Sequence, residues 1–492
     1  MARMQRSQED EPVDLTTDAV LQASDTPTPR IINGIRTAFF NSALCEGHNI
    51  PSHPECVDRV RVVRQRIVAD FPAILEVQEI APISRQRLLL FHTPKHVDAI
   101  SNIFTSVKSA SENSRKKNGG KVHHIDEDTA IAVGSEAAAL TAAGSVCEAI
   151  DLVMRYTNEE NDGSSENSPM MRITNAFCGV RPPGHHAEPH RAMGFCLFNN
   201  VGIGACYLLN TFPDVIKRVS IVDFDVHHGN GTQAKFASED YPNVQYISTH
   251  QAPFYPHTGS VHERGVHSNI MNVPLRARTG STAFRSAFES RVLPAMHAYK
   301  PDFVLISAGF DAHVQDPLAE LALESDDYYW MTQQIVDVAW KHAQGRVVSV
   351  LEGGYHLDAL AESAAAHVRA LIEGSIAPDL RVLEEQQDRY AIEELASAFE
   401  SSVTVTADTP HKELHLTVHY NGKDKLLVLK SRSLDALLLQ CKQKFNLKAS
   451  KKKKATQTTN KCSSHSLHDC HGTLITPALL LSLSNDQHLY LR

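Results

Sequence analysis

Acidic and histidine side chains alternate directly after a strand-like run near the middle of the chain. Asp223, Asp225 and His227 are two positions apart and follow the run 218–221, which predicts a buried strand. Side chains two positions apart point to the same face of an extended segment. An Asp and a His at this spacing can bind one divalent metal ion. Two carboxylates and one imidazole would leave a coordination position open for water, as a catalytic zinc site needs. The alternative interpretation is an acidic strand end before a glycine turn.

Two histidines and an aspartate follow other strand-like runs. His185 and His186 come after residues 176–180. Imidazoles titrate near neutrality and suit general acid–base catalysis, although an isolated histidine pair is more often structural. Asp311 comes after the β-rich run 304–308, which makes it a candidate third metal ligand.

A tyrosine and a phenylalanine are two further candidate site residues. Tyr355 follows a strand-like run and two glycines that allow close backbone approach, and its hydroxyl can donate to a developing oxyanion. Phe195 is next to Gly194 and close to the histidine pair, although core packing would also explain it. The reactive groups follow predicted strands that are separated by helical stretches. Open, mostly parallel α/β sheets bind their ligands at such strand ends, so we predict this fold class and a common site.

These segments, in this order along the chain, resemble the zinc-dependent histone (lysine) deacetylases, and the class II branch in particular. The resemblance extends from about Thr37 to about Gly374, and it includes His53-Pro54-Glu55 and the run 134–138 as well as the segments above. It implies an arginase/deacetylase-like open sheet flanked by helices.

The resemblance also implies a role for each reactive group. Asp225, His227 and Asp311 would bind zinc, although such a set also tolerates Fe(II) or Co(II). The tandem histidines would carry out acid–base catalysis, with His186 favoured as the general base. The remaining catalytic positions are Asp223, which would orient His185, and Tyr355, which would polarise the substrate carbonyl.

Further positions follow from the same resemblance. Asn230 stands where class I members carry an acidic partner of the histidine pair, which indicates class II. The tunnel for the substrate lysine would be lined by Gly194, Phe195, Tyr255 and Leu318, and Tyr255 replaces the usual phenylalanine. A structural monovalent cation, K⁺, would be bound by Asp223, Asp225, His227, Ser248 and Thr249, partly through backbone carbonyls.

The predicted function is zinc-dependent hydrolysis of acetyl-lysine amides in histones or other proteins, with release of acetate. Such an enzyme would regulate chromatin and repress transcription. A small-molecule amidohydrolase of the acetylpolyamine type would use the same site. A binuclear hydrolase of the arginase kind is disfavoured, because Asn230 and His313 occupy positions that would have to be acidic. A catalytically inactive scaffold is disfavoured because every active group is present.

Composition narrows the class of protein. The 492 residues carry a net charge of −9, which gives no general basic surface for nucleic acid, and 42% apolar residues are enough for a sizeable core. Nine scattered cysteines indicate reduced thiols, and hence the nucleus and/or the cytoplasm. We expect no apolar run of membrane-spanning length and no membrane contact. Residues 1–30 are expected to be a disordered tail without a signal peptide.

The predicted catalytic domain, residues 31–376, is followed by a linker helix over 377–404 and by a small α+β domain over 405–492. Alternating residues 414–420, the pair Asn421-Gly422 and the run 426–429 predict a β-hairpin. A helix beginning after Ser433 and a last strand over 488–492 complete a pattern that resembles a β-grasp module of the ubiquitin, doublecortin or PB1 type. This module would bind protein partners.

Four further polar segments lie outside the predicted site. Residues 106–121 and 158–169 are predicted to be solvent-exposed loops. Lys451–Lys454 could be a nuclear-localisation patch or a solvated charge run. The Cys and His cluster over 462–471 could form a small metal site, although its spacing fits no standard zinc finger.

Overall fold

An eight-stranded parallel sheet forms the centre of the protein in this computed structural model. The structure describes residues 37–113, 122–158 and 173–375, together with short strands between 414 and 491. The sheet order is β2-β1-β5-β10-β9-β6-β7-β8, and every pair in it is parallel. The strands are β1 (Thr37–Phe40), β2 (Leu75–Val77), β5 (Asn175–Cys178), β6 (Val219–Asp223), β7 (Val244–Gln251), β8 (Ile270–Leu275), β9 (Phe303–Ala308) and β10 (Val347–Leu351).

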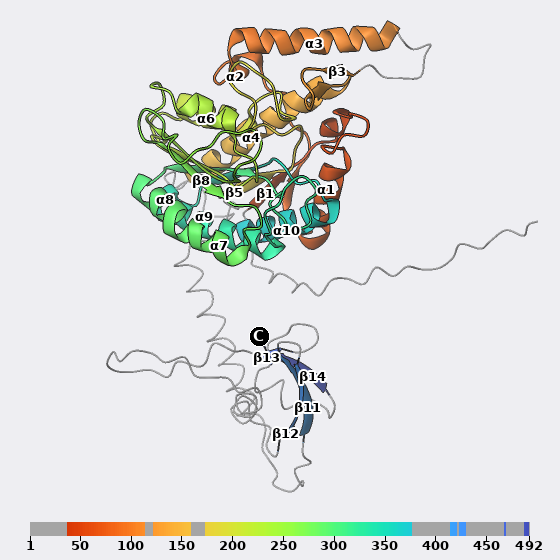
Figure 1. Cartoon of the computed structure of the whole chain (residues 1–492), viewed down its shortest axis with the longest axis vertical. Coiled ribbons are helices and arrows are strands. Elements are labelled where there is room, and N and C mark those ends of the chain that lie inside the picture. Colours follow the sequence, from red (N-terminus) through yellow and green to blue (C-terminus); the bar gives the residue numbers. More distant parts are fainter. Residues whose placement is uncertain are drawn as a thin grey trace, which may run out of the picture. The chain divides into compact units, whose positions relative to one another are not determined.

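Helices cover both faces of this sheet (Figure 1). One face packs against α2 (Arg85–Leu88), α3 (Pro94–Asn113), α4 (Ser135–Asn158), α5 (Asn200–Thr211) and α6 (Asn230–Phe236). The other face packs against α1 (Asp58–Asp70), α7 (Ser281–Ala287), α8 (Leu293–Tyr299), α9 (Ser325–Ala343) and α10 (Leu357–Glu373). Along β9, Leu305 belongs to the first core, whereas Val304 and Ile306 belong to the second. This alternation explains why the central strands are apolar throughout, as is usual in parallel sheets.

The predicted α/β class and the mostly parallel sheet are confirmed, with two local corrections. Residues 106–113 were predicted to be a loop but form the end of α3. The segment Ser135–Arg155 of α4 has the length and apolar character of a membrane span, contrary to the expectation above, but 72% of it is buried inside the protein, as in a core helix.

The C-terminal strands form a separate four-stranded sheet of order β12-β11-β14-β13. The predicted hairpin is present as β11 (Leu414–Tyr420) paired antiparallel with β12 (Lys423–Leu429), which begins three residues earlier than predicted. The last strand, β14 (Gln487–Leu491), lies parallel to β11, and β13 (Leu467–His468) pairs with β14. The predicted helix after Ser433, the linker helix, the tail 1–30, the patch Lys451–Lys454 and most of the Cys and His cluster lie outside the described residues. The β-grasp assignment and the domain boundaries stay predictions.

A buried ionic network ties the carboxyl ends of two strands to α1. Arg181, which follows β5, donates from Nε to Glu55 Oε1 at 2.7 Å, and Arg59 of α1 donates to the same oxygen at 2.9 Å. Arg59 also donates from Nε to the backbone oxygen of Gly354 at 2.6 Å, beyond the end of β10. Glu55, Arg59 and Arg181 are fully buried. Burial alone would raise the pKa of Glu55, but the two guanidinium groups hold it at about 2.

We expect Glu55→Ala to lower the free energy of unfolding by about 3–5 kcal/mol, because it leaves two guanidinium groups buried without their shared anion. Urea unfolding measures this loss. The control is Arg61→Ala, which removes an exposed ion pair with Glu46 and should cost at most about 1 kcal/mol.

The pKa of Glu55 also predicts the pH range of its contribution. Because folding lowers this pKa from about 4.5 to about 2, the stabilisation is complete above the unfolded value and is lost as the pH falls from about 4.5 toward 2. Equal losses for the Glu55→Ala and Arg61→Ala variants would contradict the assigned role of the network.

Candidate active site

The reactive groups lie at the carboxyl ends of four neighbouring strands, β5, β10, β9 and β6. Asp223 ends β6, and Asp225 and His227 occupy the turn that follows. The histidine pair follows β5, Asp311 follows β9 and Tyr355 follows β10. The carboxyl ends of adjacent parallel strands meet at one edge of the sheet, so the fold brings together groups from positions 185 to 355.

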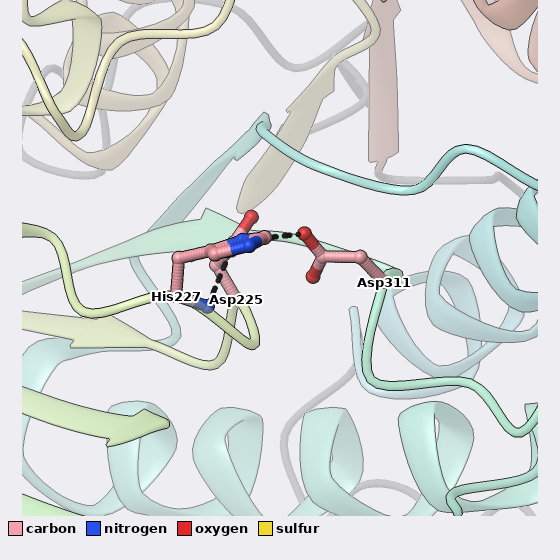
Figure 2. Close-up of side chains that lie close together, drawn as sticks. All are labelled: Asp225, His227 and Asp311. Carbon is pink, nitrogen blue, oxygen red and sulfur yellow. Dashed lines mark hydrogen bonds and ion pairs between the residues drawn. The ribbon is translucent and has the colours of Figure 1, made fainter. Parts of the chain in front are cut away.

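Asp225, His227 and Asp311 point toward one another (Figure 2). One ligand atom from each residue lies within 4.8 Å of the others. His227 Nδ1 is 3.1 Å from Asp225 Oδ1 and 3.1 Å from Asp311 Oδ2. Ligand atoms at about 2.0–2.1 Å from a tetrahedral zinc ion are separated by about 3.3 Å. The donor types and these separations therefore fit a zinc ion with three protein ligands.

Glycines allow backbone to pack directly against the two carboxylates. A Cβ atom at Gly309 would lie 2.0 Å from Asp225 Oδ2, and one at Gly353 would lie 2.0 Å from Asp311 Oδ2. Without a side chain, the Gly353 N–H donates to Asp225 Oδ2 at 2.8 Å. The Val226 N–H donates to Asp311 Oδ1 at 2.9 Å. These bonds orient both carboxylates before any ion is bound.

The electrostatics of the three groups favour a cation between them. Burial and the charge of Asp225 raise the pKa of Asp311. Burial would also raise the pKa of Asp225, but the charges of His185 and His227 lower it. Burial opposes protonation of His227, yet its contacts with both carboxylates raise its pKa to about 9. Two buried carboxylates thus attract the nearest available positive charge, which a divalent ion can supply.

The two adjacent histidines have different partners. His185 Nδ1 donates to Asp223 Oδ2 at 3.1 Å, and Tyr246 donates its hydroxyl to the same oxygen at 2.9 Å. His186 Nδ1 lies 2.7 Å from Asn230 Oδ1. Asp223 and Asn230 therefore lie one beside each histidine.

The two histidines have pKa shifts of opposite sign. Burial alone would lower the pKa of His185, but the charges of Asp225 and Asp223 raise it well above its ordinary value. Burial, together with the positive charges of His185 and His227, lowers the pKa of His186 well below its ordinary value. The pair thus combines one histidine that favours the charged form with one that stays neutral.

Two of the residues predicted to line a tunnel, Phe195 and Tyr255, contact catalytic side chains. Phe195 has a left-handed backbone (φ 69°), as does Gly194 (φ 57°), and the Phe195 ring stands edge-on to Tyr355 at 5.9 Å between centroids. Tyr255 stands edge-on to His186 at 5.2 Å. Leu318 is half-buried, and its N–H donates to Asp316 Oδ1 at 2.9 Å. Phe254, which no sequence pattern singles out, stacks its ring on His227 at 5.2 Å between centroids.

Tyr355 is fixed by two contacts that sequence reasoning also missed. Its N–H donates to Asp316 Oδ2 at 2.7 Å, and the Arg59 guanidinium lies over its ring at 5.0 Å. Burial raises the pKa of Tyr355 well above its ordinary value, so its hydroxyl remains a proton donor. The motif His53-Pro54-Glu55 contained the signal for this network, but only the fold places Glu55 beside Arg59.

Of the residues predicted to bind K⁺, Asp223, Ser248 and Thr249 lie on two paired strands. Asp223 of β6 is opposite Ser248 of β7. Ser248 Oγ is 2.9 Å from His250 Nδ1, and the buried hydroxyl of Thr249 has no hydrogen-bond partner in the described part of the chain. Asp225 and His227 belong to the metal-ligand cluster that also contains Asp311. K⁺ binding stays a prediction.

Comparisons with known proteins agree with this geometry. The family described as "Histone deacetylase domain" matches residues 53–371. The chain is 37% identical to Histone deacetylase 14, chloroplastic, of Arabidopsis thaliana, over 69% of this chain and 78% of that protein. It is 33% identical to Type-2 histone deacetylase 2 of Dictyostelium discoideum over 73% of this chain, but it spans only 22% of that protein's length. The crystal structure of the HDA15 HD domain superposes with a TM-score of 0.58 at 32% identity, over 69% of this chain and 90% of that one.

We expect Asp225→Ala, His227→Ala and Asp311→Ala each to lose the bound metal, because each removes one of three converging ligand atoms. Metal analysis of the purified proteins measures this loss, with circular dichroism as a check of the fold. Asp214→Ala, at an exposed position, should keep full metal content. Full zinc occupancy in all three folded variants would exclude this ligand set.

Proposed function

The chain belongs to the histone deacetylase domain family and is a deacetylase hydrolase, and from this premise we propose that it removes acetyl groups from lysine side chains of histones or other proteins. The observation that carries the proposal is the convergence of Asp225, His227 and Asp311 beside the tandem histidines His185 and His186. Removal of acetyl groups from histones would make the protein a chromatin regulator that represses transcription.

Zinc is the proposed cofactor, held by Asp225, His227 and Asp311. When bound there, zinc supplies Lewis acidity, which polarises a carbonyl group and makes water more acidic. The donor set of one imidazole and two carboxylates, oriented by backbone N–H groups, supports this choice. We also propose a structural K⁺ beside β6 and β7.

The histidine pair would divide the proton transfers. His186 is neutral, so its free ring nitrogen can take a proton from the attacking water. Water oxygen adds to the acetyl carbon, the carbon–nitrogen bond of the amide breaks, and the same proton can pass to the leaving lysine nitrogen. His185, whose pKa is raised by the charges of Asp225 and Asp223, would stabilise the negative charge that develops beside it. The products are acetate and a free lysine side chain.

Tyr355 would stabilise the oxyanion. Its hydroxyl stays protonated and can donate a hydrogen bond to the carbonyl oxygen as negative charge develops there. The contacts of its ring with Arg59 and Phe195 support a fixed orientation, so little reorganisation is needed during the reaction.

Tyr355→Phe should reduce kcat by roughly 10²–10³, the usual cost of removing one oxyanion donor. Zinc content and melting temperature should remain those of the wild type, because the ring is retained. Steady-state kinetics on an acetyl-lysine peptide measures the effect. Wild-type turnover in this variant would mean that another group polarises the carbonyl.

Leu318 supports a protein substrate over a polyamine. At the proposed tunnel mouth a leucine gives apolar contact for the stem of a lysine and no charge for a cationic chain. The neighbouring Asp316 is occupied by the backbone N–H groups of Leu318 and Tyr355.

We therefore expect acetyl-lysine peptides to have a much higher kcat/KM than acetylspermidine. Leu318→Glu should shift the ratio toward the polyamine by about fivefold, because an exposed ion pair contributes only about 0–1 kcal/mol. Leu318→Gln is the matched control without the charge. A wild-type preference for acetylspermidine would support the small-molecule amidohydrolase instead.

The C-terminal residues 405–492 are proposed to form a β-grasp-like module that binds protein partners. The mixed sheet of β11, β12, β13 and β14 supports this proposal. A chain ending at Thr404 should keep its activity on a short peptide and lose the partner. An inactive but folded truncation would mean that the module serves the catalytic site.

The cell compartment is proposed to be the nucleus and/or the cytoplasm. Six cysteines in the described part of the chain are free, as is usual in reducing compartments. Imaging of the tagged full-length chain would test this location.

A further inference from the structure

A chain of hydrogen bonds leads from His186 away from the metal-ligand cluster. His186 Nδ1 lies 2.7 Å from Asn230 Oδ1, and Asn230 Nδ2 donates to Glu188 Oε1 at 2.9 Å. His186 and Asn230 are buried, whereas the Glu188 side chain is 18% exposed. Arg191 and His190 contact the Glu188 carboxylate at 3.3 and 3.5 Å. The chain therefore ends in a carboxylate that is partly exposed to solvent and contacts two basic side chains.

The carboxylate sets the direction of every bond in this chain. An ionised carboxylate only accepts hydrogen bonds, so Asn230 must turn its NH₂ group toward Glu188 and its oxygen toward His186. Without such a neighbour, an amide could present either edge to the imidazole. A neutral imidazole has one N–H group, and the Asn230 oxygen requires it at Nδ1. The lone pair then lies on Nε2.

Glu188 is held in place by its backbone. Its N–H donates to the Arg191 oxygen at 2.9 Å, and its carbonyl oxygen accepts from His92 Nδ1 at 3.1 Å. His92 Nε2 accepts in turn from the N–H of Asn199 at 2.9 Å, so the proton of His92 is fixed on Nδ1. The position of Glu188 thus depends on buried contacts rather than on its surface ion pairs.

We propose that Glu188 is a positioning residue that fixes the Nδ1–H tautomer of His186 through Asn230 and so keeps Nε2 free to accept a proton. The inference deepens the proposed function, because it rests on His186 acting as the base. His185 does not need such a relay, since its own partner, Asp223, is a carboxylate that already requires a donor at Nδ1.

The hydrogen-bond relay from Glu188 through Asn230 to His186 can be broken by one substitution and bypassed by a second. Glu188→Leu removes the carboxylate acceptor of the Asn230 NH₂ group and leaves only the weak acceptor Met193 Sδ at 3.4 Å, so Asn230 can turn over and the wrong tautomer becomes populated. General-base catalysis contributes about 10²–10⁴ in rate, so we expect kcat to fall by about 10-fold or more while KM and zinc content stay unchanged. Adding Asn230→Asp places a carboxylate directly against His186, which should restore most of the lost kcat.

Two further variants separate this role from packing and from surface charge. The double variant Glu188→Gln with Asn230→Asp exchanges the amide and the carboxylate at nearly constant shape. Its kcat should be higher than that of Glu188→Gln alone. This pair keeps the proposal testable if Glu188→Leu does not fold. Arg191→Gln removes a surface partner of Glu188 without touching Asn230 and should keep the wild-type kcat. A wild-type kcat in Glu188→Leu, or no recovery on adding Asn230→Asp, would overturn the proposal.

A spectroscopic measurement tests the tautomer without any substrate. In ¹⁵N-histidine-labelled, zinc-loaded protein, the His186 signals, identified by their absence from His186→Gln, should show a protonated Nδ1 and an unprotonated Nε2. Glu188→Leu should shift both signals toward the average of the two tautomers. Unchanged signals would overturn the tautomer role even if the enzyme is active. Conversely, the expected signals in a protein that cannot deacetylate would refute the proposed function alone.

Discussion

The burial of several carboxylates at one end of a parallel sheet is the constraint on which the rest of this structure depends. Asp223, Asp225, Asp311, Glu352 and Glu55 are all fully buried. An uncompensated buried charge costs far more than a domain can tolerate, so each must find donors or cations nearby. Backbone N–H groups supply many of them: Gly184 and His185 donate to Glu352 at 2.6 and 3.1 Å. The loops after the strands are therefore shaped by the acids they surround.

This constraint also explains how two neighbouring histidines acquire different chemistry. They share one loop, and their rings are 4.1 Å apart between centroids. Nearby charges raise the pKa of His185, through Asp225 and Asp223, whereas burial and the charges of His185 and His227 lower the pKa of His186. The group that faces each Nδ1 atom also differs: a carboxylate for His185 and an amide oxygen for His186. A carboxylate stabilises the imidazolium directly, whereas an amide fixes the proton position without adding a full charge. The charge of the relay is carried one residue further out, on Glu188.

Much of the site could be predicted because its signals are local. Asp225 and His227 are two positions apart, and the fold class follows from apolar runs that alternate with helical stretches. Asp311, 84 residues beyond His227, was also a candidate ligand from the β-rich run before it, and the resemblance to a family added the order of the motifs and the role of each group. The positions of Tyr255 and Leu318 also came from the resemblance, because no periodicity places a loop residue at a tunnel. The end of α3 was mistaken for a loop because its polar last turns carry no apolar periodicity, although a helix of this length can continue beyond its packed face.

Contacts that depend on the assembled fold left no local signal. Arg59 lies 295 residues from Gly354 and 126 residues separate Arg181 from Glu55, so only tertiary structure shows that they form one network. That network joins stability to chemistry. Arg59 binds the backbone oxygens of Glu352 and Gly354 and lies over the ring of Tyr355. The residue proposed to stabilise the oxyanion is thus held by the same guanidinium that compensates a buried glutamate. Any movement of the Tyr355 loop would also break buried ionic contacts. The free-energy cost of that movement keeps the tyrosine hydroxyl in place during the reaction.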